Sequence, residues 1–67
     1  MPVIEVTLVE GREPDRLRDL ITRLTDAAVE AIGAPRESVR VILREVPQTH
    51  FAAGDVTIAE RRAGSSG

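Results

Sequence analysis

The sequence predicts an α+β fold built on a strand-helix-strand unit, and three patterns in this chain of 67 residues predict it. Apolar residues alternate along residues 2–9, recur at steps of three and four along 13–32, and alternate again along 38–46. Alternation is typical of a strand, and the longer steps are typical of an amphipathic helix. A helix that joins two such strands predicts a right-handed crossover with parallel strands.

The first strand is expected over Pro2–Val9. Ile4, Val6 and Leu8 share one of its faces, and the opposite face also carries apolar residues. This distribution favours a strand that is covered on both sides. The segment Glu10–Arg12 is expected to turn the chain.

A helix is expected to start at Glu13, Pro14 and Asp15, because proline suits the first helical position and acidic groups favour the positive end of the helix dipole. It is expected to reach about Ile32 and to stop at Gly33. Its apolar stripe predicts the face that packs on the sheet. The stripe consists of Leu17, Leu20, Ile21, Leu24, Ala27, Ala28, Ala31 and Ile32.

The second strand is expected over Ser38–Val46 and ends at Pro47. The turn-rich residues 48–55 and the short β-branched run 56–58 predict a small C-terminal hairpin, and Ala59–Arg62 predicts one helical turn. Residues 63–67 have the composition of a flexible tail. The chain is therefore expected to form a single domain over residues 1–62, followed by the tail 63–67.

The small size of the chain favours self-association. A domain of this length buries only about 60% of the surface that its unfolded chain exposes. The absence of cysteine removes disulfides and thiolate metal sites as supports. Because one helix covers only one face of a two-stranded sheet, an obligate oligomer is expected to cover the other face.

Composition argues against several classes of function. A net charge of −2 and a pI near 5.3 do not suit a nucleic-acid surface, and Phe51 is the only aromatic residue on which a base could stack. No apolar run has the length of a membrane span and no leader is apparent, so a soluble, cytoplasmic protein is expected. With His50 as the only histidine, a metal site is not expected, and no phosphate loop or nucleophile elbow appears.

Pro2 is the first candidate for chemistry. Removal of Met1 would leave a free secondary amine, and an α-amino group titrates near ~8 when unperturbed. Modest burial or nearby positive charge brings this pKa towards neutrality, where general bases work best. The alternative is an ordinary Met-Pro start with no chemistry attached.

Two arginines are the next candidates. Arg12 lies at the turn after the first strand, where its guanidinium is displayed for a carboxylate, although a solvated surface arginine is the alternative. Arg40 lies among apolar residues of the second strand, where a buried arginine must find a partner or line a cavity. Arg44 on the same strand face leaves open a generic polar patch.

The residues around the expected hairpin have competing interpretations. Phe51 suits either the core or an apolar wall beside an amine. His50 is expected to cap or to hydrogen bond within its turn.

Five short segments stand out together by their order and spacing. They are Met1-Pro2, Leu8-Val9-Glu10-Gly11-Arg12, Ala34-Pro35, Ser38-Val39-Arg40-Val41 and His50-Phe51. In this combination they closely resemble the short-chain 4-oxalocrotonate tautomerases, and the resemblance covers the chain from Pro2 to about Arg62.

The resemblance implies a cofactor-independent isomerase with the tautomerase fold. Protomers would pair into a four-stranded sheet, and three such dimers would form a homo-hexamer. Pro2 would be the general base, and Arg12 and Arg40, from different subunits, would bind and polarise the substrate. Phe51 would pack near Pro2, with Leu8 in the same apolar wall. The implied substrate is an unsaturated hydroxy or oxo acid such as 2-hydroxymuconate, converted from 2-hydroxy-dienoate to 2-oxo-enoate during aromatic compound degradation.

The chain departs from the family pattern after Phe51. Ala52–Asp55 stands where the common form has glycines and a larger aliphatic residue, so Ala53 is expected to shorten one pocket wall. Asp55 is tolerable in place of glycine if its backbone is left-handed. Dehalogenating members of the family are expected to carry an additional arginine near the end of the first strand and a water-activating glutamate. Val9 and Ala52–Ala53 offer neither of these residues. A catalytically silent ligand-binding oligomer and a tautomerase of a biosynthetic pathway remain the alternatives.

Overall fold

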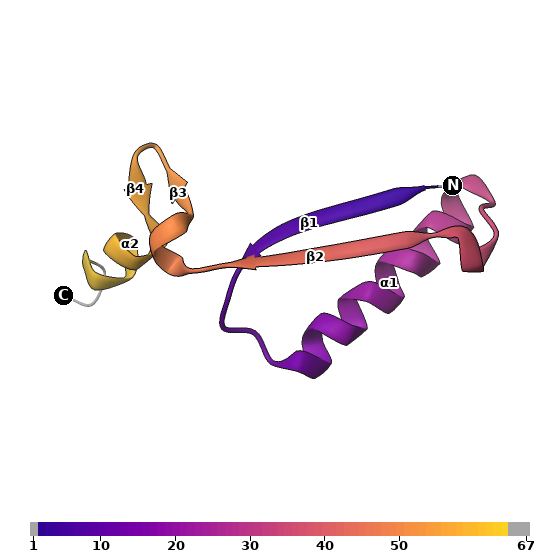
Figure 1. Cartoon of the computed structure of the whole chain (residues 1–67), viewed down its shortest axis with the longest axis horizontal. Coiled ribbons are helices and arrows are strands. Elements are labelled where there is room, and N and C mark those ends of the chain that lie inside the picture. Colours follow the sequence, from indigo (N-terminus) through magenta and orange to yellow (C-terminus); the bar gives the residue numbers. More distant parts are fainter. Residues whose placement is uncertain (1, 65–67) are drawn as a thin grey trace.

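The computed structural model describes residues 2–64, and its main body is the expected strand-helix-strand unit (Figure 1). A small C-terminal unit follows it. The elements in chain order are β1 (Val3–Val9), α1 (Pro14–Ile32), the 3-10 turn η1 (Arg36–Ser38), β2 (Arg40–Val46), the 3-10 turn η2 (Gln48–His50), β3 (Ala52–Ala53), β4 (Val56–Thr57) and α2 (Ile58–Gly64).

β1 and β2 are parallel neighbours, in register from Val3 opposite Arg40 to Val9 opposite Val46. The expectation that the second strand begins at Ser38 was wrong, because η1 occupies residues 36–38. The Ser38 N–H donates to the Pro35 carbonyl at 2.9 Å, as in a tight turn rather than a sheet ladder.

α1 begins and ends where the sequence predicts. Pro14 is its first residue, and Gly33 ends it with a left-handed φ of 67° and an N–H bond to the Val29 carbonyl at 3.0 Å. A left-handed backbone at this position suits glycine, which has no side chain to clash. Within residues 2–64, neither helix combines the length and the apolar character that crossing a bilayer requires.

The helix covers one face of the sheet, but the buried stripe is narrower than predicted. Leu17, Leu20, Ile21, Leu24 and Ala28 are half-buried, as expected. The other three predicted members of the stripe are exposed, and Ile32 is 67% exposed. Two strands lie only about 5 Å apart, so the sheet is too narrow to cover the full width of the stripe. The three exposed members are Ala27, Ala31 and Ile32.

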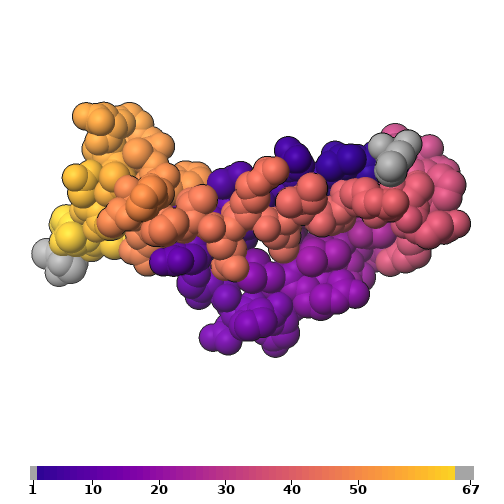
Figure 2. All heavy atoms as spheres, in the orientation of Figure 1, coloured from indigo at the N-terminus to yellow at the C-terminus, as the bar shows by residue number. Residues whose placement is uncertain are grey.

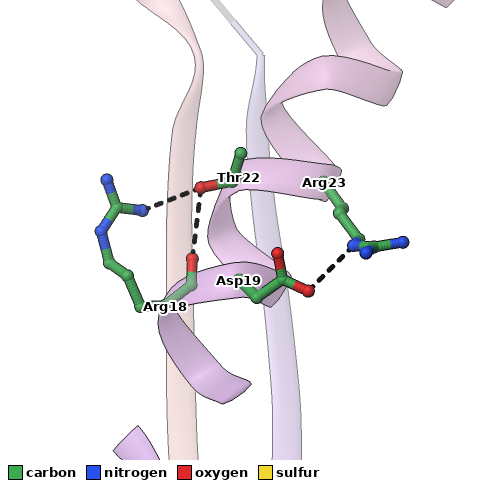
Figure 3. Close-up of polar contacts among 4 residues, drawn as sticks. All are labelled: Arg18, Asp19, Thr22 and Arg23. Atoms are coloured by element: carbon green, nitrogen blue, oxygen red, sulfur yellow. Dashed lines mark hydrogen bonds and ion pairs between the residues drawn. The ribbon is translucent and has the colours of Figure 1, made fainter. Parts of the chain in front are cut away.

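The outer side of α1 carries polar pairs one helical turn apart (Figure 3). The Arg23 Nε donates to Asp19 Oδ2 at 2.9 Å, and the Arg18 Nη1 donates to Thr22 Oγ1 at 3.2 Å. Exposed pairs of this kind contribute only about 0.3–0.5 kcal/mol each. They mark the solvent side of the helix rather than a site.

The C-terminal unit contains the expected hairpin. Gly54 and Asp55 form a two-residue turn with φ of 59° and 68°, which is typical of the tight turns that suit hairpin twist. Asp55 thus adopts the left-handed backbone that its place in the sequence requires. α2 continues to Gly64, two residues into the segment expected as a tail, and residues 65–67 lie outside those that the structure describes.

The chain is elongated, and the C-terminal unit lies at one end of the sheet (Figures 1 and 2). Its Cα radius of gyration is 15.4 Å, whereas a compact chain of this length has a radius of about 11 Å. Within residues 2–64, only Val9 and Ala34 are buried. On the sheet face away from α1, Val3 and Ile42 are 54% and 40% exposed. Such a chain leaves apolar surface in water that a second copy is able to cover.

Candidate active site

Pro2 and Arg40 lie at the same end of the sheet. Pro2 is half-buried directly before β1, and its carbonyl accepts the backbone N–H of Arg40 at 3.0 Å. This bond joins the start of β1 to the start of β2. The candidate base and one candidate arginine are therefore brought together by the register of the parallel strands.

The Arg40 side chain is exposed in the single chain, contrary to the expectation of a buried arginine. Its Nη1 donates to the Glu37 carbonyl at 2.9 Å, and η1 presents that carbonyl. Arg44 on the same face has a different partner, because its Nη2 lies 3.4 Å from Glu5 Oε1. The two arginines therefore have different hydrogen-bond partners although they lie on the same strand face. A guanidinium has five N–H donors, so one carbonyl bond orients Arg40 and leaves donors for a ligand.

Arg12 lies at the opposite end of the sheet. The turn that displays it contains Gly11 at φ 120°, a backbone that glycine adopts without strain. The Arg12 Nη1 donates to the Val9 carbonyl at 2.8 Å. This bond holds the guanidinium close to the end of β1. Leu8, which precedes Val9 in β1, is half-buried.

Phe51 belongs to the same end as Arg12, because it follows the end of β2. It is half-buried, and its carbonyl accepts the Ile58 N–H at 2.9 Å. His50 beside it bonds within its turn, as expected. Its N–H donates to the Pro47 carbonyl at 2.9 Å, and its Nδ1 lies 2.9 Å from Thr49 Oγ1.

Two residues near Phe51 were not identified from the sequence. The Glu60 N–H donates to Thr57 Oγ1 at 3.0 Å, and the Thr57 N–H donates to Glu60 Oε1 at 2.9 Å. These reciprocal bonds form a capping box at the start of α2. The spacing Thr-x-x-Glu at residues 57–60 was the signal from which this motif was predictable.

The candidate residues thus form two half-sites at opposite ends of one chain. Pro2 and Arg40 lie at one end, and Leu8, Arg12 and Phe51 lie at the other, separated by the seven residues of β1, which span about 20 Å. Residues 2–64 of a single chain enclose no pocket, and no three acidic or histidine side chains among them converge as metal ligands.

Comparison with known proteins supports a specific family. The chain matches the family model described as "Tautomerase enzyme" over residues 2–61. A probable tautomerase of Ralstonia nicotianae is 55% identical over 56 residues, which are 84% of this chain and 80% of that protein.

Two solved structures have the same fold at substantial identity. TomN, a 4-oxalocrotonate tautomerase homologue in the tomaymycin biosynthetic pathway, has a TM-score of 0.90 and is 48% identical, over 92% of this chain and 95% of that chain. A heterohexamer 4-oxalocrotonate tautomerase from Chloroflexus aurantiacus has a TM-score of 0.86 and is 37% identical, over 90% of this chain and 97% of that chain.

The family model that matches residues 2–61 describes tautomerases, which are isomerases. The chain belongs to the tautomerase family, and the structures that it matches are 4-oxalocrotonate tautomerase homologues. The fold and the family expected from the sequence are both confirmed.

Proposed function

We propose that this protein is a cofactor-independent keto-enol tautomerase that converts 2-hydroxymuconate-like 2-hydroxy-dienoates to 2-oxo-enoates. Pro2 is the general base once Met1 has been removed. The observation that carries the proposal is the bond between the Pro2 carbonyl and the Arg40 N–H at 3.0 Å. It supports the proposal because it joins the backbone of Pro2, whose nitrogen would become the N-terminal amine, to the backbone of Arg40 at one end of a tautomerase fold.

The reaction moves one proton and changes no other atom. The Pro2 nitrogen accepts the proton of the 2-hydroxyl group, and the C2–O bond becomes a carbonyl as the double bonds shift. The same nitrogen then delivers the proton to the carbon next to the remote carboxylate. The product is the conjugated 2-oxo acid, and the amine returns to its neutral form ready for the next turnover.

The two arginines act on the charge that moves. Negative charge develops first on the 2-oxygen. Arg40 stabilises both this charge and the charge of the neighbouring carboxylate, as preorganised donors do in oxyanion sites. Arg12 binds the remote carboxylate and draws electron density towards it. Guanidinium groups suit both tasks because their planar fork matches a carboxylate.

The base must be neutral at pH 7, so the pKa of the Pro2 amine must lie below its usual range. Two cationic guanidinium groups and an apolar wall from Leu8 and Phe51 all disfavour the protonated amine. Both influences lower its pKa. The apolar wall also excludes water that would otherwise compete for the proton.

The complete site requires a homo-oligomer, and we infer a hexamer built as a trimer of dimers. The half-site with Pro2 and Arg40 in one copy meets the half-site with Leu8, Arg12 and Phe51 in another. The open sheet face and the elongated shape support this inference, since a single chain buries so little of its own surface. The hexameric state of the Chloroflexus homologue also supports it. Light scattering should give six times the 7.3 kDa mass of one chain.

A tautomerase of a biosynthetic pathway is a second candidate. The relation to TomN, at 48% identity and a TM-score of 0.90, favours it. Both candidates use the same base, so a panel of enol acids distinguishes them. A higher kcat/KM for another enol acid than for 2-hydroxymuconate would favour the biosynthetic role.

The proposal is tested with protein that carries no N-terminal tag, because any extension acylates the proline nitrogen. Mass spectrometry should show a chain without Met1, and ultraviolet absorbance should follow ketonisation of 2-hydroxymuconate. In Pro2→Ala the rate should fall by about 10²-fold or more, the usual contribution of a general base. An unchanged rate in this variant would show that Pro2 is not the base.

A further inference from the structure

The start of α2 is fixed by a closed set of hydrogen bonds. Thr57 Oγ1 accepts the Glu60 N–H at 3.0 Å, while Glu60 Oε1 accepts the Thr57 N–H at 2.9 Å. α2 has only seven residues, and so short a helix is marginal without support at its ends. The capping box supplies that support at the N-terminal end.

The same helix start also holds the backbone of Phe51. The first N–H groups of a helix have no partner within it, and here the N–H of Ile58, the first residue, donates to the Phe51 carbonyl at 2.9 Å. Thr57 is in addition the partner of Ala52 across the hairpin. The strands of this hairpin have two residues each, too few to hold a position alone. The place of Phe51 therefore depends on where α2 begins.

We propose that Thr57 and Glu60 are positioning residues, whose capping box fixes Phe51 and with it the apolar wall that faces the Pro2 amine of another copy. This inference rests on the proposed function. Neither side chain touches the substrate in this arrangement. The effect passes from the capping box to the Ile58 N–H, then to the Phe51 carbonyl and finally to its ring.

The main contacts of α2 are with η2 and β4, within the C-terminal unit. Loss of the capping box is therefore expected to loosen Phe51 while β1, α1 and β2 keep their fold. This separation allows the role of the capping box to be measured in a folded protein. Far-ultraviolet circular dichroism and the native mass check that the variants remain folded and assembled.

The first experiment uses Phe51 as its own reporter. The chain has one phenylalanine and neither tyrosine nor tryptophan, so its aromatic proton NMR signals come from Phe51 and His50 alone. In Thr57→Ala, the Phe51 ring signals should move towards the positions of an unfolded chain. Thr57→Ser and Glu60→Gln should keep the native positions, because a serine hydroxyl and a glutamine oxygen also complete a capping box. Glu60→Ala provides a second disrupting variant that alters only an exposed side chain.

The second experiment measures kcat/KM against pH in the assembled enzyme. A looser wall lets water reach the Pro2 amine and stabilise its protonated form. The apparent pKa of the acid limb in Thr57→Ala should therefore rise by about half a pH unit, which corresponds to a loss of activity of about threefold at pH 6. Phe51→Ala should cause a larger rise, and adding Thr57→Ala to it should cause no more. The charged groups assigned to the site, Arg12 and Arg40, are the same in all these variants. His50→Gln removes the only imidazole and should leave the profile unchanged.

The outcomes separate this inference from the proposed function. A shift in Phe51→Ala but not in Thr57→Ala or Glu60→Ala would overturn the positioning role alone. The role would also be overturned if Glu60→Gln behaved like Glu60→Ala. An unchanged pH profile in Phe51→Ala would show that Phe51 forms no apolar wall beside the Pro2 amine, and it would therefore also refute the positioning role. Full activity in Pro2→Ala would instead refute the base.

Discussion

The composite site makes a quantitative prediction for mixtures of two inactive variants. Pro2 and Arg12 lie at opposite ends of β1, whose seven residues span about 20 Å, farther than an arginine side chain reaches. The proposed site therefore takes Pro2 from one copy and Arg12 from another. Pro2→Ala and Arg12→Ala each inactivate every site in their own homo-oligomers, but each retains the half-site that the other lacks.

The recovery in a mixture follows from counting chains. When the two variants assemble at random in equal amounts, half of the Pro2 positions and half of the Arg12 positions are intact. About one quarter of the sites then regain both residues, because the two come from independently chosen copies. The separate variants should show about one hundredth of the normal activity or less. The mixture should therefore be at least tenfold more active than either component.

The assay is ketonisation of 2-hydroxymuconate after the two untagged chains have been unfolded together in denaturant and refolded. The control mixes the same chains after separate refolding, which keeps the homo-oligomers apart and should restore little activity. A second control refolds the double variant Pro2→Ala/Arg12→Ala with wild-type protein. Activity in the first mixture no higher than the average of its components would refute the placement of Pro2 and Arg12 in different copies.

Four further predictions follow from the same structure. Arg12→Ala should lower kcat/KM for a dicarboxylate by about a hundredfold, the upper value of a charged hydrogen bond, and should change it little for an analogue without the remote carboxylate; equal losses would contradict its assigned role. On the acid side, kcat/KM should fall tenfold per pH unit with a midpoint below ~8, because a protonated Pro2 amine accepts no proton, and a pH-independent rate would argue against an amine base. Gly33→Ala should destabilise the protein by about 1–2 kcal/mol in urea at fixed protein concentration, because φ is 67° and the added Cβ meets nothing within 4 Å, so the penalty is one of backbone alone. Ile42→Lys should reduce the native mass in light scattering, because Ile42 lies on the sheet face assigned to contact between copies, whereas Thr7→Ser on the same face should not.

Local patterns predicted the elements well, because local interactions set their limits. Proline at the first helical position and glycine in a left-handed backbone gave both ends of α1 without any tertiary information. The hairpin turn was predictable for the same reason, since Gly54 and Asp55 both tolerate positive φ. The Thr57–Glu60 capping box is equally local. It was not predicted, although the Thr-x-x-Glu spacing is present in the sequence.

The errors arose at the limits of the periodic patterns. Val39 continues the apolar alternation of the second strand and Ser38 precedes it, yet the strand begins only at Arg40 because η1 occupies residues 36–38. Ala27, Ala31 and Ile32 fit the helical stripe but extend beyond what two strands cover. In both cases the hydrophobic period predicted the correct type of element. It did not predict how far the strand or the buried stripe extends. For the helical stripe that limit is set by the width of a sheet whose strands are distant in sequence, whereas for Ser38 it is set by the local turn bond to the Pro35 carbonyl.

The sequence by itself determined the β-α-β fold, the tautomerase family and the identity of the candidate residues Pro2, Leu8, Arg12, Arg40 and Phe51. Periodicity, helix-end residues and short motifs encode all of these within a few neighbouring positions. Only the tertiary structure decided which of these residues meet. Parallel register joins Pro2 to Arg40 through a backbone bond, and the length of β1 keeps both away from Arg12 and Phe51. Strand direction and length are properties of the folded chain, and they are the physical reason that these candidate residues lie in two groups at opposite ends of one copy.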